Sequence, residues 1–318
     1  MPIFISFTKI NSEMYLNYYM KIKTIISLLK ETFGEWNKDG ASTLAASLAY
    51  YTIFSIAPLV IIAIAIAGSI FGEEAARGQI VTQIQSLVGK DGAEVIETAI
   101  KNSRQPEANS IASLISIVIL LFGASGVFAQ LQDALNTIWN VKVKPQKGVL
   151  TFLRKRLLSF SAVLGIGFLL LVSLVVSASL SAFTGYLGGF LQNMSILGTV
   201  LNFTISFGVI TLLFAFMFKY LPDVKITWND VIIGAVITAL LFNIGKFLLG
   251  LYLGTGSFSS TYGAAGSLVI LLIWVYYSAQ ILFFGAEFTQ VYASRYGSQI
   301  VPNKYAERVD RNKQPSSR

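Results

Sequence analysis

Residues 157–218 read LLSFSAVLGIGFLLLVSLVVSASLSAFTGYLGGFLQNMSILGTVLNFTISFGVITLLFAFMF, and none of these 62 residues is Lys, Arg, Asp or Glu. A helix crosses the hydrocarbon core of a bilayer with about 20 apolar residues, at about 1.5 Å rise each. One helix of this length would measure about 93 Å, roughly three times the core thickness. The stretch is therefore predicted to fold back as two membrane spans. The turn is expected among its small and polar residues, Gly185, Gly188, Gly189, Gln192 and Asn193.

Charged and uncharged stretches alternate in the same way along the whole chain. Only 13% of the 318 residues are charged and 54% are hydrophobic, whereas soluble domains have roughly 25% charged residues. The pattern predicts an all-α, polytopic membrane protein with six transmembrane helices. The predicted spans are residues 44–72, 110–132, 157–183, 196–218, 230–253 and 266–290.

Lys and Arg are distributed unequally over the connecting segments. Nineteen lie in the N-terminal segment, the second and fourth loops and the tail, whereas four lie in the first loop and none in the third or fifth. The positive-inside rule then predicts that the N- and C-termini are both cytoplasmic. The net charge of +8 indicates topology and contact with anionic headgroups more than nucleic-acid binding.

Three regions are predicted: residues 1–43 form a cytoplasmic segment, 44–292 a transmembrane domain, and 293–318 a basic, disordered cytoplasmic tail. The N-terminus has no basic segment followed by an apolar run and a cleavage site, so no cleaved signal peptide is expected. The candidate natural starts are Met1, Met14 and Met20.

Two stretches are predicted to be amphipathic helices that do not span the membrane. In the N-terminal segment, apolar residues recur at helical spacing with lysines on other faces, which indicates a helix lying on the cytoplasmic leaflet. These apolar residues are Ile22, Ile25, Ile26, Leu29, Phe33 and Trp36. The first outward loop, about residues 73–109, predicts two short helices separated at Gly89-Lys90-Asp91-Gly92. They either line or merely cover the outer mouth of the bundle.

The chain contains no Cys and no His. This excludes disulfides and thiol chemistry, and it removes the commonest general base and metal ligand. No Gly-rich phosphate loop, zinc-binding helix motif or serine elbow is present either. We therefore expect no cofactor, no metal site and no catalytic residues, and the protein is not expected to be an enzyme.

Lys246 and Glu287 are charged residues inside predicted spans, where a charge is costly and usually faces a cavity, a partner or the interface. Lys246 lies about 24 Å from the inner end of the fifth span, so it belongs to the outer third and can snorkel to the headgroups. Glu287 lies about 31 Å along the sixth span, at its cytoplasmic end. Depth thus predicts that the two charges lie at opposite mouths of the bundle.

Further polar residues are candidates for a substrate pathway. Asp133 falls at the inner end of the second span, together with Gln130, Gln132 and Asn136. Asp133 and Glu287 are predicted to form a polar cluster on the cytoplasmic side, balanced by Arg154 or Arg156. Ordinary interfacial pairing is the alternative. Tyr262 lies in an uncharged, hydroxyl-rich loop that either borders an outer vestibule or only connects two spans. The remaining pathway candidates are Asn243 and Gln280.

Three residues are predicted to shape helix packing. Gly250 and Gly254 form a GxxxG pattern, which is a common but weak signal for close helix contact. Pro58 in the first span either bends that helix or fits its packing.

Several motifs together resemble the YihY/BrkB family of bacterial inner-membrane proteins. The resemblance covers about residues 35–295. The motifs are Ala49-Tyr50-Tyr51-Thr52 with Ser55 and Pro58, Gly123-Ala124-Ser125-Gly126-Val127-Phe128, Leu135-Asn136-Thr137-Ile138-Trp139, Tyr220-Leu221-Pro222, Gly245-Lys246, Tyr262-Gly263-Ala264-Ala265-Gly266-Ser267, Trp274-Val275-Tyr276-Tyr277 and Gly285-Ala286-Glu287. The resemblance implies a six-helix, transporter-like protein of the bacterial inner membrane. Some members carry an old label as ribonuclease BN, which this chain fits badly because tRNA cleavage calls for a metal cluster or a His pair.

The leading hypothesis is a transporter or flippase-like protein that moves a lipid or amphiphilic solute across the cytoplasmic membrane. The alternative is a structural or scaffolding membrane protein of the envelope, and a tRNA-processing ribonuclease is disfavoured. The expected partners are membrane lipids and an unnamed substrate, without nucleic acid, and a homo-oligomer is an open alternative.

Overall fold

The computed structural model describes residues 23–103, 110–144, 195–255, 266–297 and 300–309. These ranges are mostly helical, and four of their helices contain a segment long and apolar enough to cross a membrane. The four helices are α2 (Ala41–Phe71), α6 (Ser195–Tyr220), α7 (Trp228–Thr255) and α9 (Gly266–Arg295). They coincide with the first, fourth, fifth and sixth predicted spans. The second predicted span lies within α4 (Ser110–Ile138), a helix of 29 residues, and the third lies outside the described residues.

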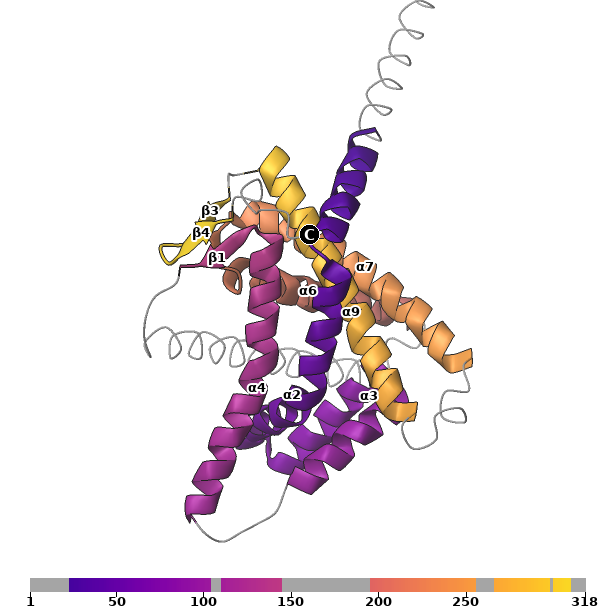
Figure 1. The fold of residues 1–318 in the computed structure, drawn as a ribbon. Helices are drawn as coiled ribbons and strands as arrows, with labels where there is room; N and C mark the ends of the chain where they lie inside the picture. Colours follow the sequence, from indigo (N-terminus) through magenta and orange to yellow (C-terminus); the bar gives the residue numbers. More distant parts are fainter. Residues whose placement is uncertain (1–22, 104–109, 145–194, 256–265, 298–299, 310–318) are drawn as a thin grey trace, which may run out of the picture.

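Figure 1 shows α3 (Glu73–Ser103) at one end of the molecule and the strands at the other. We call the end with the strands, where α4 and α9 finish, the terminal end. The end where α2 meets α3 is called the loop end.

Helices α7 and α9 run antiparallel and approach closely through reciprocal Gly–Thr contacts. A Cβ added to Gly234 would lie 1.8 Å from Thr289 Oγ1, and one added to Gly285 would lie 1.9 Å from Thr238 Oγ1. Each Thr hydroxyl donates to the carbonyl four residues earlier in its own helix, at 2.7 Å. The hydroxyls are thereby satisfied inside the contact, which we call the α7/α9 seam. Small residues allow helix backbones in membranes to approach in this way.

Residues 300–309, which lie within the tail that was predicted to be disordered, form two short strands at the terminal end. Strand β4 (Ala306–Arg308) pairs antiparallel with β1 (Val141–Val143), directly after α4. Strand β3 (Val301–Pro302) pairs antiparallel with β2 (Val224–Lys225), between α6 and α7. The tail therefore connects the ends of three helices through backbone hydrogen bonds, which depend little on side-chain identity.

Residues 23–38 form a helix beside the C-terminal part of α9. Leu28 is buried in a cluster with Phe288 and Val291 of α9, and Arg295 pairs with Glu31. Most of the predicted apolar stripe is exposed instead of packed on the protein. Its exposed members are Ile25, Ile26, Leu29 and Phe33.

Helix α3 changes direction along its length. Arg77 lies 3.3 Å from Glu97, although 20 residues of straight helix would separate them by about 30 Å. The sequence predicted two helices separated at Gly89–Gly92, a segment that lies between these two residues. The structure has one helical element whose two arms lie side by side.

Candidate functional site

Glu287 is a fully buried carboxylate on α9, with none of its surface exposed. In sequence it lies between Gly285 and Thr289, which form the α9 side of the α7/α9 seam, so its side chain is on the opposite face of α9. A carboxylate inside an apolar span is costly, and such residues are functional candidates by default. Glu287 is therefore the strongest of the predicted pathway residues.

Lys246 does not lie near Glu287 in depth. The antiparallel register of the seam pairs Gly234 with Thr289 and Thr238 with Gly285, so Glu287 lies level with position 236 of α7. Lys246 is ten residues further along, which is about 15 Å of helix. It is exposed, with exposed Phe247 beside it, so the structure does not bring the two charges together.

Asn243 of α7 and Gln280 of α9 lie at about the same height along their helices, as the antiparallel register of the seam shows. The Asn243 Nδ2 group donates to the Ala239 carbonyl at 2.8 Å, within its own helix. The Gln280 Oε1 atom is buried and accepts no hydrogen bond from the described part of the chain. A buried amide oxygen without a donor is costly, so Gln280 is a second polar position facing protein within the predicted spans.

The predicted inner polar cluster has a different membership from the one expected. Asn136 Nδ2 donates to Asp223 Oδ2 at 3.0 Å, and the Asp223 backbone N–H donates back to Asn136 Oδ1 at 2.7 Å. Gln132 also donates to Asp223 Oδ2, at 3.2 Å. Asp133, by contrast, is exposed on α4. The sequence analysis missed Asp223, whose only local signal was its place after Leu221-Pro222.

The remaining predicted residues are distributed elsewhere. Pro58 packs against Gly123 of α4, where an added Cβ would lie 3.1 Å from the proline ring, and Ser55 donates to the Gly123 carbonyl at 2.6 Å. A Cβ on Gly250 would meet nothing within 4 Å, so close packing occurs at Gly234 and Gly285 instead. Tyr262, Arg154 and Arg156 lie outside the described residues, as do the surroundings of Gly254.

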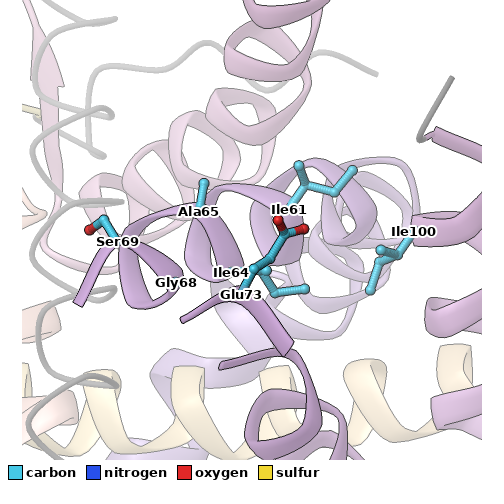
Figure 2. Close-up of a pocket in the computed structure, with 7 residues that line it drawn as sticks. All are labelled: Ile61, Ile64, Ala65, Gly68, Ser69, Glu73 and Ile100. Carbon is cyan, nitrogen blue, oxygen red and sulfur yellow. The ribbon is translucent and has the colours of Figure 1, made fainter. Parts of the chain in front are cut away.

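A pocket of about 300 Å³ lies at the loop end, between α2 and α3. We call it the α2/α3 pocket. Figure 2 shows the Glu73 carboxylate directed toward the isoleucine side chains and away from Ser69. The lining residues are Ile61, Ile64, Ala65, Gly68, Ser69, Glu73 and Ile100. Both arms of α3 contribute, because Glu73 and Ile100 are 27 residues apart.

A partly exposed group of charges joins the two arms of α3 near this pocket. Glu97 lies 3.1 Å from the Lys101 ammonium and 3.3 Å from the Arg77 guanidinium. The hydrogen bond and charge of Lys101, followed by the charge of Arg77, hold the pKa of Glu97 below its usual value. Glu97 therefore stays ionised at neutral pH, and its ion pair with Arg77 links the two arms. Within the described ranges, no three Asp or Glu side chains come close enough to hold a metal ion.

A family model described as Virulence factor BrkB matches residues 32–310. The chain belongs to this BrkB family. The predicted resemblance is thus confirmed. The match extends beyond residue 295 and includes the tail strands β3 and β4 of this chain.

The curated relatives of this BrkB-family chain are named as UPF0761 membrane proteins. It is 29% identical to one from Rhodospirillum centenum, over 80% of this chain and 54% of the relative. It is 26% identical to one from Alcanivorax borkumensis, over 85% and 60% respectively. A relative from Pseudoalteromonas translucida is 27% identical, over 86% of this chain and 90% of its own length. The chain thus spans little more than half of the first two relatives. No solved structure matches it.

Proposed function

We propose that the protein moves a lipid or another amphiphile across the bacterial cytoplasmic membrane, with its N- and C-termini on the cytoplasmic side. The observation that carries the proposal is Glu287, a carboxylate with no exposed surface within an apolar span. A buried acid in a span typically belongs to an ion or substrate pathway, since a packing role alone would be met by an apolar residue.

The two mouths of the bundle support the same proposal. Glu287 and the Asn136–Asp223 contacts lie toward the terminal end, whereas the α2/α3 pocket lies at the loop end. An amphiphile needs apolar surface for its chain and polar groups for its head, and the pocket offers both. The proposed pathway therefore runs between two separate polar positions and needs no central ion pair of Lys246 with Glu287.

A scaffolding protein is the second candidate, and a specific observation favours it. The α7/α9 seam is packed so tightly that two glycines have no room for a methyl group. The Thr hydroxyls there are satisfied within their own helices. Such a seam fixes helices in place, which a scaffold requires along its whole length.

Reconstitution into liposomes distinguishes the two candidates. Leaflet exchange and solute flux are measured for the wild type, Glu287→Gln, Lys246→Ala and the exposed control Glu94→Gln. We expect Glu287→Gln to lower the rate by about tenfold, the effect of about 1.4 kcal/mol on a barrier, with Glu94→Gln unchanged. Because Lys246 is exposed on the side of α7, its substitution is expected to have the smaller effect. Matching thermal unfolding curves exclude a folding defect.

Background signals for every variant, the wild type included, across lipid and solute panels would reject transport and leave the scaffold. The ribonuclease interpretation has its own test with purified protein and tRNA. We expect no cleavage with or without divalent metal ions. Metal-dependent cleavage that disappears in Asp133→Asn or Glu287→Gln would reinstate an enzymatic function.

A further inference from the structure

We propose that the outer surface of α6 and α7 binds an anionic phospholipid, with the lipid phosphate at Lys219 and an acyl chain along the two helices. The site lies at the terminal end, and its residues include neither Glu287 nor the lining of the α2/α3 pocket. The inference goes beyond the proposed function, because a lipid can occupy this surface whether or not the protein moves lipids.

Three exposed aromatic side chains form the centre of the proposed site. Phe216 and Tyr220 of α6 and Trp228 of α7 are 39%, 60% and 38% exposed. The Trp228 ring lies edge-on at 5.8 Å from the Phe216 ring and 5.9 Å from the Tyr220 ring, and these two rings stack at 5.5 Å. We call the three residues the aromatic cluster. Their contacts connect α6 to α7 at the surface, so the two helices present one continuous apolar face here.

The aromatic cluster lies at the level where lipid headgroups are expected. The segments of α6 and α7 that are apolar enough to cross a membrane are Phe203–Tyr220 and Trp228–Tyr252. The cluster therefore occupies the last turn of one segment and the first residue of the next. Tyr and Trp prefer the headgroup level of a bilayer because their rings are amphipathic. A lipid bound at the cluster thus has its headgroup beside the α6–α7 turn and its chains beside the spans.

Exposed apolar side chains continue from the cluster along both helices. On α7, Ile232, Val236 and Leu240 follow Trp228 at intervals of four residues and are exposed, so they share one face of the helix. On α6, Leu212 is exposed one turn before the cluster. Leu240 is twelve residues after Trp228, which is about 18 Å of helix. This length is close to half of the roughly 30 Å hydrocarbon core, as one acyl chain requires.

Lys219 places a positive charge at the edge of the aromatic cluster. Its ammonium group donates to the Ile226 carbonyl and lies 5.7 Å from the centre of the Trp228 ring. These two contacts fix its position. Among the residues that the structure describes, no carboxylate forms an ion pair with Lys219. An ammonium group has three donors, so it can also donate a charge-assisted hydrogen bond to a phosphate.

A second lysine favours an anionic headgroup over a zwitterionic one. Lys225 is exposed and directly precedes Ile226, the residue that accepts the Lys219 hydrogen bond. Basic residues at the membrane surface attract anionic lipids. A phosphatidylcholine headgroup has the same phosphate but brings its own cation close to the two lysines. The charges therefore provide the selectivity for an anionic lipid, and the apolar stripes provide much of the affinity.

Native mass spectrometry of the purified full chain tests this proposal with three probes. Dioleoyl phosphatidylglycerol is anionic, dioleoyl phosphatidylcholine has the same chains with a zwitterionic headgroup, and inorganic phosphate has no chains. Lys219→Gln removes the charge, whereas Lys219→Arg keeps it. The matched control Lys144→Gln removes an exposed lysine directly after β1, outside the cluster. Ile232→Asn places a polar group in the exposed stripe of α7.

We expect the wild type to bind phosphatidylglycerol more tightly than phosphatidylcholine. Lys219→Gln should weaken phosphatidylglycerol binding about fivefold, the effect of one lysine at an anionic lipid surface, and leave phosphatidylcholine binding unchanged. Lys219→Arg and Lys144→Gln should both bind phosphatidylglycerol as the wild type does. Ile232→Asn should weaken binding of both lipids, and excess inorganic phosphate should not displace phosphatidylglycerol.

Several outcomes would overturn the proposal. Equal phosphatidylglycerol binding by Lys219→Gln and Lys144→Gln would show that no particular lysine holds the phosphate. Equal loss of both lipids in Lys219→Gln would show that the side chain supports the surface without selecting charge. Displacement by inorganic phosphate would indicate a site for a free anion. A dimer that excludes both lipids would assign the surface to a second copy of the chain.

Discussion

The terminal end and the loop end of the bundle are built in opposite ways. At the terminal end, helices meet at glycines without free space, a partly buried Asp–Asn contact joins α4 to the α6–α7 turn, and tail strands pair with the segments after α4 and between α6 and α7. At the loop end, α2 and α3 border an open pocket of about 300 Å³, and the partly exposed ion pair of Arg77 with Glu97 links the arms of α3. Under the proposed function, a ligand would enter at the loop end, where a pocket is already open, and passage at the terminal end would require tightly packed contacts to separate.

The largest expected effect comes from adding a methyl group in the α7/α9 seam. In Gly285→Ala the new Cβ would lie 1.9 Å from Thr238 Oγ1 and 2.8 Å from Thr238 Cβ, so one helix has to move. Overpacking of this kind costs about 1–3 kcal/mol, which thermal unfolding in detergent will measure. Gly250→Ala, on the same pair of helices but with nothing within 4 Å, is the control and should be neutral or slightly stabilising.

A second substitution locates the origin of this cost. Thr238→Ala removes the two side-chain atoms nearest to the new methyl group, so the double variant should recover part of the lost stability, and the coupling energy should exceed about 0.5 kcal/mol. Strict additivity of the two changes would show that the seam is not the reason for the destabilisation. The terminal end would then be less tightly packed than the comparison requires.

The Asn136–Asp223 contact is expected to have the next largest effect. Asn136→Leu removes one hydrogen bond to the Asp223 carboxylate and one from its backbone N–H. Gln132 still donates to this half-buried carboxylate, so the loss of the two hydrogen bonds to Asn136 should cost about 1–3 kcal/mol. Asp133→Asn, three residues earlier and exposed, should change stability by less than about 0.5 kcal/mol. Similar unfolding temperatures for the two variants would mean that the cluster does not hold the terminal end.

The long helices could be predicted from the sequence because hydrophobicity is a local property. Uncharged runs located α2, α6, α7 and α9 to within a few residues, and the loop helices followed from apolar spacing. The tail strands could not be found in this way. Residues 300–309 have no strong strand pattern of their own, and they are ordered by backbone pairing with β1 and β2.

At the candidate site, prediction from the sequence failed mainly for residues that contact each other across long sequence separations. Asp223 is 87 residues from Asn136, and nothing in its neighbourhood indicates this partner. The sequence drew attention to Gly250 and Gly254, yet the close contacts form at Gly234 and Gly285 with Thr partners. Many Gly and Thr residues have suitable spacing, and only the register of two packed helices decides which of them meet.

The smallest expected effect is the pH dependence of the α3 arms at the loop end. Lys101 and then Arg77 lower the pKa of Glu97, so the folded protein binds the proton more weakly than the unfolded chain. The stabilisation that ionised Glu97 gives the folded protein is therefore complete above the ordinary Glu pKa of about 4.3. It is lost as the pH falls through the lowered pKa of Glu97.

Distances between two spin labels measure whether the arms stay together. Because the chain has no Cys, labels at Gln79→Cys and Glu94→Cys report on the two arms alone. We expect a narrow distance distribution at pH 7 that broadens below about pH 4, and a Glu97→Gln background that is equally broad at both pH values. A narrow distribution in that background at pH 7 would show that apolar packing of Ile96 and Ile100 holds the arms, and the loop end would then resemble the terminal end.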